Sequence, residues 1–181
     1  MKKIIAVLSL VFFLYVILSG CDDRTEDAKM VHQAMYQVTK KMEKQYQLRY
    51  IGMIEGGDKQ FYKEIGIEFM VFRIITKDEG RKMLVEGVEE LLHELNSNPQ
   101  LEPYLQPHPF TVANVQISIF SYHPDRTKAY YPDIISFTAY SGKVRYVTDS
   151  PQPQYKYKHF TEEEESYEEA AKIVHAQNQV P

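Results

Sequence analysis

The sequence contains a single cysteine and no tryptophan. With only Cys21 available among 181 residues, the chain cannot close a disulfide within itself, so its stability has to come from packing. The 14 tyrosines and 9 phenylalanines supply the large aromatic side chains that a core needs. Acidic residues outnumber basic ones, 25 to 21, and this balance argues against nucleic acid as a partner.

The sequence also lacks a recognisable catalytic motif. The pair Gly56-Gly57 lacks the strand-to-helix context of a phosphate-binding loop, and no serine or threonine sits in a nucleophile elbow. No two histidines have the three- or four-residue spacing of a helical metal site. The six histidines are His32, His93, His108, His123, His159 and His175. We therefore expect no cofactor and no strong metal site.

One loose constellation of titratable residues remains. His108, His123, Asp125 and Asp133 fall in expected loops or strand ends, which could converge at one end of a sheet as a metal site or an acid-base pair. A hydrolase with its site near His108 and His123 is the alternative function that this constellation supports. In the other interpretation all four are solvated loop residues, and the two aspartates shape turns beside neighbouring prolines.

The N-terminal stretch is the most informative part of the chain. Lys2 and Lys3 give it a positive start, and residues 4–18 are an apolar run without a charge. That run has the length of a signal peptide rather than of a membrane span. We expect the chain to be exported.

The apolar run ends in Leu18-Ser19-Gly20-Cys21. These residues resemble the lipobox of bacterial prolipoproteins, in which a branched apolar residue and two small residues precede a cysteine. The resemblance implies cleavage between Gly20 and Cys21 and acylation of Cys21, which would then be unavailable for thiol catalysis. One acyl chain binds a membrane only marginally, so two or three chains are needed for stable anchoring. An ordinary secretory signal, an uncleaved membrane helix or a buried core helix are the alternatives.

Asp22 follows the cysteine directly. An aspartate here resembles the signal that retains lipoproteins in the inner membrane of enterobacteria. It favours the periplasmic face of the inner membrane, with the outer membrane or the cell surface as alternatives.

Processing would divide the chain into a signal peptide at 1–20, a short acidic tether at 21–27 and one domain at 28–181. Removing residues 1–20 from the 181-residue chain leaves 161 residues with a net charge of −6, a length that suits a single domain with its own core.

Hydrophobic periodicity predicts three helices and five strands. Helices are expected at 25–45, at 76–96 and from 161 onward; strands are expected at 46–54, 65–72, 115–122, 134–140 and 143–148. Runs of strands between helices indicate an α+β fold in the order α-β-β-α-β-β-β-α, with a mostly antiparallel sheet of about five strands and the helices on one face.

Particular residues support these elements. Thr76 and Thr161 each open a capping box, and Ser141-Gly142 suits a two-residue hairpin. In the first strand, Tyr50 and Ile54 are expected on one side. In the first helix the stripe of Val31, Met35, Val38 and Met42 is interpreted as core, with an adaptable binding surface as the alternative. The proline-bearing loop 98–111 is expected to be ordered by its apolar residues.

One segment alternates aromatic and basic residues. An extended backbone would give it a ring face and a cationic face, which could stack on sugar rings, contact anionic head groups or dock on a protein. An edge strand guarded by lysines is the alternative. The segment consists of Tyr155, Lys156, Tyr157, Lys158, His159 and Phe160.

We therefore expect a lipid-anchored envelope lipoprotein with a non-enzymatic α+β binding domain. Its partners would be the membrane, through acyl chains on Cys21, and a protein or other envelope component. Besides the hydrolase, a structural or assembly subunit of an envelope complex is an alternative, which a large exposed apolar patch would favour.

Overall fold

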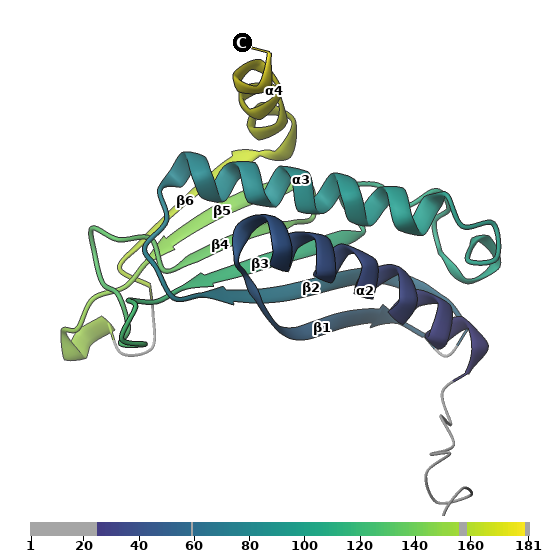
Figure 1. Cartoon of the computed structure of the whole chain (residues 1–181), viewed down its shortest axis with the longest axis horizontal. Coiled ribbons are helices and arrows are strands. Elements are labelled where there is room, and N and C mark those ends of the chain that lie inside the picture. Colours follow the sequence, from purple (N-terminus) through teal and green to yellow (C-terminus); the bar gives the residue numbers. More distant parts are fainter. Residues whose placement is uncertain (1–24, 59, 156–158, 180–181) are drawn as a thin grey trace, which may run out of the picture.

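The computed structural model describes residues 25–58, 60–155 and 159–179 (Figure 1). The helices within these ranges are α2 (Glu26–Tyr46), α3 (Lys77–Asn96) and α4 (Tyr167–Asn178), with two short 3₁₀-helices, η1 (Glu102–Tyr104) and η2 (Pro153–Tyr155). The strands are β1 (Arg49–Gly57), β2 (Tyr62–Val71), β3 (Val115–Ser121), β4 (Ser136–Tyr140), β5 (Lys143–Thr148) and β6 (Thr161–Ser166).

The six described strands form one sheet in the order β1-β2-β3-β4-β5-β6. Neighbouring strands are antiparallel except β2 and β3, which run parallel because the α3 crossover connects them. Helices α2 and α3 lie side by side over one face of the sheet, and α4 follows β6 and packs against α3 (Figure 1). The predicted α+β class with three helices is confirmed, and the predicted order of elements is broadly matched. The sheet is mixed, with one parallel pair among antiparallel ones, and it has six strands rather than about five.

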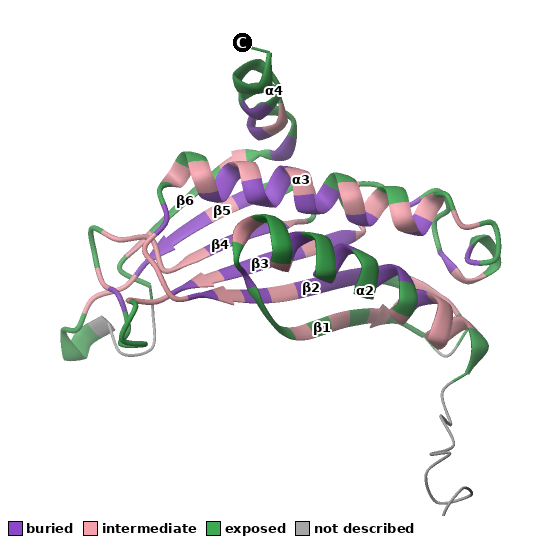
Figure 2. Cartoon of the chain, viewed as in Figure 1, coloured by how far each residue is buried: buried purple, intermediate pink, exposed green. Residues whose placement is uncertain are grey.

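The core lies between the two long helices and the sheet (Figure 2). Alternate residues of β2, namely Ile65, Ile67 and Phe69, face the helices and are fully buried. Glu68 and Met70 point to the opposite face and are only half-buried, because α2 and α3 both lie on the other side. The sheet therefore has one packed face and one open face.

Helix α3 matches its prediction closely. Its N-cap is Thr76, whose side chain accepts the N–H of Glu79 at 3.2 Å. The helix ends at Asn96, whose side-chain amide accepts the N–H of Phe110 at 2.8 Å and donates to the carbonyl of the same residue at 2.9 Å. These bonds and the burial of Leu101 and Phe110 order the proline-bearing loop, as predicted.

The sixth strand, Thr161–Ser166, occupies the place where the sequence predicts the start of the last helix, so that prediction is wrong. Its glutamates pair with basic residues of β5. Lys143 Nζ lies 2.9 Å from Glu164, and Arg145 Nη1 lies 3.3 Å from Glu162. Opposite charges across a strand pair are stabilising. The acidic run suits the first turn of a helix equally well, but pairing with β5 makes it a strand.

Helix α4 begins at Tyr167, six residues later than expected. Its capping box is formed by Ser166 and Glu169: Ser166 Oγ accepts the N–H of Glu169, and the Glu169 carboxylate accepts the N–H of Ser166, each at 3.2 Å. Tyr167, Ala170 and Val174 are buried and form the inner face of the helix. The helix itself is confirmed.

Candidate binding groove between α2 and β1

Among the described strands, β1 lies at an edge of the sheet and pairs with β2 alone. An edge strand presents backbone N–H and C=O groups to which another chain can pair. Tyr50, Ile51 and Met53 of β1 are 36%, 39% and 41% exposed, large values for apolar side chains. The opposite edge, β6, instead carries four consecutive glutamates from Glu162. Of the two edges, β1 is the apolar one.

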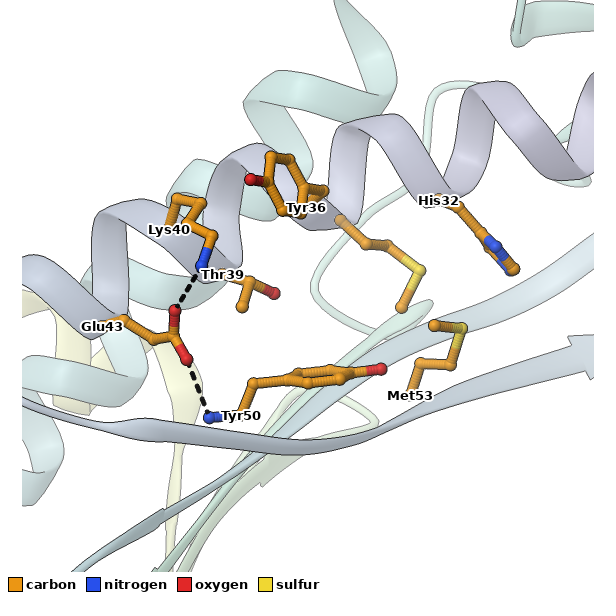
Figure 3. A pocket seen from close by; sticks show the side chains of 8 residues that line it. His32, Tyr36, Thr39, Lys40, Glu43, Tyr50 and Met53 are labelled. Atoms are coloured by element: carbon orange, nitrogen blue, oxygen red, sulfur yellow. Dashed lines mark hydrogen bonds and ion pairs between the residues drawn. The ribbon is translucent and has the colours of Figure 1, made fainter. Parts of the chain in front are cut away.

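A cavity of about 350 Å³ separates α2 from β1 (Figure 3). This volume lies within the range of small-molecule and side-chain binding pockets. Its lining residues are His32, Met35, Tyr36, Thr39, Lys40, Glu43, Tyr50 and Met53. Those from α2 recur every three or four residues, so one stripe of the helix forms one wall of the cavity.

The wall contributed by β1 depends on a β-bulge. Tyr50 pairs with Phe69 and Met53 pairs with Ile67, two residues that face the helices. In a regular strand, residues three apart point to opposite faces, but the bulge between Tyr50 and Gly52 puts both side chains on the helix side. The same bulge sends Ile54, paired with Gly66, to the open face. The prediction that Tyr50 and Ile54 share a side is therefore wrong.

Polar pairs lie at the two ends of the groove. At one end, His32 Nε2 and Glu55 Oε1 are 2.8 Å apart. At the other end, Lys40 Nζ donates to Glu43 Oε2 at 3.0 Å, and the backbone N–H of Tyr50 donates to Glu43 Oε1 at 3.2 Å (Figure 3). The hydrogen bond between Lys40 and Glu43 lowers the pKa of Glu43 and raises the pKa of Lys40. Glu43 is therefore charged at neutral pH.

The middle of the groove is apolar and adaptable. Met35 and Met53 bring flexible thioethers, which fit ligands of varied shape. The rings of Tyr36, 53% exposed, and Tyr50 bring flat apolar surface with a polar tip. None of the eight lining residues is a serine or a cysteine, so none of them places such a nucleophile next to the His32–Glu55 pair. This arrangement suits binding by shape and burial.

The structure does not bring the predicted constellation together. His108 lies in the loop before β3, whereas His123, Asp125 and Asp133 lie between β3 and β4. The two groups thus stand at opposite ends of β3, and a seven-residue strand spans about 23 Å. In the described ranges, no three or more His, Cys, Asp or Glu side chains form a group that could hold a metal ion.

Asp125 shapes a turn, as its alternative interpretation required. Its carboxylate accepts the N–H of Thr127 at 2.9 Å and the hydroxyl of the same residue at 2.6 Å. These hydrogen bonds lower the pKa of Asp125. Asp133 also lies in a turn, where its N–H donates to the carbonyl of Tyr130 at 2.9 Å.

The other predicted site residues fall partly outside the described residues. Tyr155 ends η2, Lys156, Tyr157 and Lys158 are not described, and His159 and Phe160 are exposed just before β6. The Phe160 ring meets Tyr131 edge-on, with 5.1 Å between centroids.

The lipobox residue Gly20, the acylation site Cys21 and the sorting residue Asp22 also lie outside the described residues. Within the described ranges, no helix is both long and apolar enough to cross a membrane.

Sequence reasoning did not predict the groove, although it left an adaptable binding surface as the alternative for the stripe that contains Met35, and a further signal was present. Met35 belongs to the predicted core stripe of α2 and is buried. Beside that stripe, His32, Tyr36 and Lys40 recur every four residues and place a large aromatic ring on the exposed side of the helix. An exposed tyrosine next to an apolar stripe indicates a surface with apolar character.

Comparisons with protein families, with curated proteins and with solved structures found no match.

Proposed function

We propose that the protein is a lipid-anchored envelope lipoprotein whose α+β domain is a non-enzymatic binding module. The observation that carries the binding role is the groove between α2 and β1, where exposed Tyr36, Tyr50 and Met53 surround an apolar cavity. Partly exposed tyrosines and methionines around a pocket are typical of a protein-binding surface.

The lipobox supports the anchor. Cys21 is the only cysteine, and it stands where the box requires it. Each methylene group buried in a bilayer contributes about 0.8 kcal/mol, so two or three acyl chains on Cys21 hold the protein stably.

A short tether would keep the groove near the membrane. Helix α2 begins at Glu26, five residues after Cys21, and five extended residues reach about 18 Å. His32, at one end of the groove, lies six residues further along the helix, about 9 Å along its axis. We infer that the partner is a protein or another envelope component near the membrane surface.

An assembly subunit is the second candidate, and it draws on the same surface. Four exposed apolar residues, Tyr36, Tyr50, Ile51 and Met53, gather on one edge of the domain. The hydrolase alternative has less support, because His108 and His123 stand at opposite ends of β3.

The anchor is tested by replacing Cys21 with Ala. Cells that express either form are labelled with a fatty-acid probe and separated into membrane and soluble fractions. We expect the wild-type protein to carry label in the membrane fraction and the variant to lose the label. Equal labelling of the two forms refutes the anchor.

The groove is tested in the same cells with a photoreactive amino acid at Met53. A matched control carries it at Ile173 of α4, which is exposed to a similar degree, 38% against 41%. We expect a discrete crosslinked product from position 53 and none from position 173. Products from both positions, or from neither, contradict a binding site in the groove.

A further inference from the structure

We propose that the occupant of the groove is an extended segment of a partner protein that pairs antiparallel with β1 as a seventh strand and inserts an apolar side chain between α2 and β1. This inference rests on the proposed function, since it names what the groove binds.

The backbone of β1 favours a strand as the occupant. Residues Gly52–Gly56 pair in regular register with β2 on one side, and the other side of this stretch is the edge of the sheet. Backbone hydrogen bonds along such an edge give affinity, and pockets beside it select side chains.

A side chain of α2 already occupies one hydrogen-bonding position on β1. The N–H of Tyr50 donates to the Glu43 carboxylate at 3.2 Å. The backbone carbonyl of an added strand can accept the same N–H in place of the Glu43 carboxylate. Glu43 thus shows that the edge at Tyr50 is accessible to an acceptor from outside the sheet.

The spacing of the groove fits the side chains of an added strand. Alternate residues of a strand lie about 6.6 Å apart on one face, and residues one turn apart on a helix lie about 6 Å apart. Tyr36 and Lys40 of α2 are such a pair. A large apolar side chain of the added strand therefore enters the cavity between Tyr36 and Tyr50, where Met35 and Met53 adapt to its shape.

Charge gives the added strand a direction. An antiparallel strand starts opposite Gly56 and ends opposite Tyr50. At that end the residues next to the Glu43–Tyr50 hydrogen bond in the sequence are the exposed Lys44 of α2 and Arg49 of β1. Lys40 is already paired with Glu43. An acidic residue or a free carboxylate at the downstream end of the partner segment is complementary to these cations.

The bulge argues against a second copy of this chain as the occupant. The extra residue Ile51 interrupts the regular pairing of β1. Two copies of β1 paired antiparallel would place two bulges in one short ladder, whereas a regular foreign strand meets only one. Edge-strand bulges oppose pairing between identical edges in this way.

The experiment uses the protein purified from membranes in detergent. Random peptides of 12 residues displayed on phage are selected against it, and an enriched peptide is synthesised with single N-methyl groups at each backbone position. An N-methyl group removes one backbone donor. We expect methylation at every second residue to weaken binding about tenfold or more and methylation at the residues between to be tolerated.

Two exposed positions provide matched variants. Met53→Arg places a charge in the cavity and should abolish peptide binding, whereas Ile173→Arg on α4 should leave it unchanged. Peptides that bind the Met53→Arg protein equally well, a methylation profile without period two, or failure to enrich any peptide each overturn the proposal. So does a dimer that peptide cannot dissociate, measured by light scattering, because it would make a second copy the occupant.

The two proposals fail in distinguishable ways. A crosslinked product at Met53 without period-two methylation sensitivity leaves the groove as a binding site and removes the strand. Loss of both the product and the peptides removes the binding site itself.

Discussion

Gly80 offers a direct test of how closely α3 packs on the sheet. A β-carbon at Gly80 would lie 2.2 Å from Cδ1 and 2.4 Å from Cε1 of Phe137, a fully buried residue of β4. Phe137 is held in place because its ring packs edge-on against Tyr146, with 5.9 Å between centroids. Gly80→Ala therefore forces the first turn of α3 away from the sheet.

Two opposing effects set the size of the change. Alanine gains up to about 1 kcal/mol over glycine within a helix, whereas overpacking a core contact costs about 1 to 3 kcal/mol and occasionally more. Because the new contact is far below van der Waals separation, we expect the larger cost and a net loss of about 2 kcal/mol in the free energy of unfolding. For a domain of this size that loss lowers Tm by roughly 4 to 8 °C.

Gly87→Ala, in the same helix, is the matched control. The atom nearest to its β-carbon would be Met42 Cε at 3.1 Å, the flexible end of a side chain, and Ile117 follows at 3.5 Å. We expect this variant to equal the wild type or to gain up to about 1 kcal/mol. Urea denaturation followed by far-ultraviolet circular dichroism measures both variants. If Gly80→Ala proves as stable as Gly87→Ala, the packing of α3 on β4 is looser than described.

Two further predictions concern charged groups. Glu165→Gln should lower the free energy of unfolding by about 2 to 4 kcal/mol, because it leaves the buried guanidinium of Arg81, 2.7 Å away, with only its carboxylate partner on α3. Glu163→Gln on the same strand should lower the free energy of unfolding by less than about 1 kcal/mol, because Glu163 is exposed. Equal losses for the two variants in urea denaturation would show that burial of the Arg81–Glu165 pair does not increase its contribution to stability. Asp149→Asn should reduce the loss of stability in acid, because the hydrogen bond from Lys128 lowers the pKa of Asp149 in the folded protein. The charged carboxylate therefore stabilises the fold above its unfolded pKa of about 3.9. This stabilisation disappears as the pH falls through the folded-state pKa. Thermal melts at pH 7 and pH 3 measure this difference, and an identical fall of Tm in wild type and variant speaks against it.

Local signals in the sequence were enough for several elements. Thr76 as N-cap and the hydrophobic periodicity that follows it predicted α3 from end to end. The hairpin between β4 and β5 followed from Ser141-Gly142, whose φ angles of 48° and 74° are those of a tight two-residue turn. Such features depend only on residues close in the chain, so the sequence predicts them well. The lipobox is equally local, and acylation of Cys21 stays a prediction.

The sixth strand could not be predicted from local signals. Four glutamates after a threonine suit the first turn of a helix as well as the edge of a sheet. Lys143 and Arg145 decide between the two, and they come from β5, which ends thirteen residues before Thr161. Only pairing in space brings these charges together.

The candidate groove depended even more on tertiary structure. In the sequence, Tyr50 and Met53 are three residues apart, a spacing that puts strand side chains on opposite faces. The bulge at Ile51 turns both toward α2, because it shifts the pairing of β1 with β2 by one residue. The sequence alone thus determined the positions of α2 and α3 and the turn between β4 and β5, because these features depend on residues close in the chain. Which side chains meet at the groove was decided by strand pairing, because a shift of one residue in register exchanges the two faces of a strand.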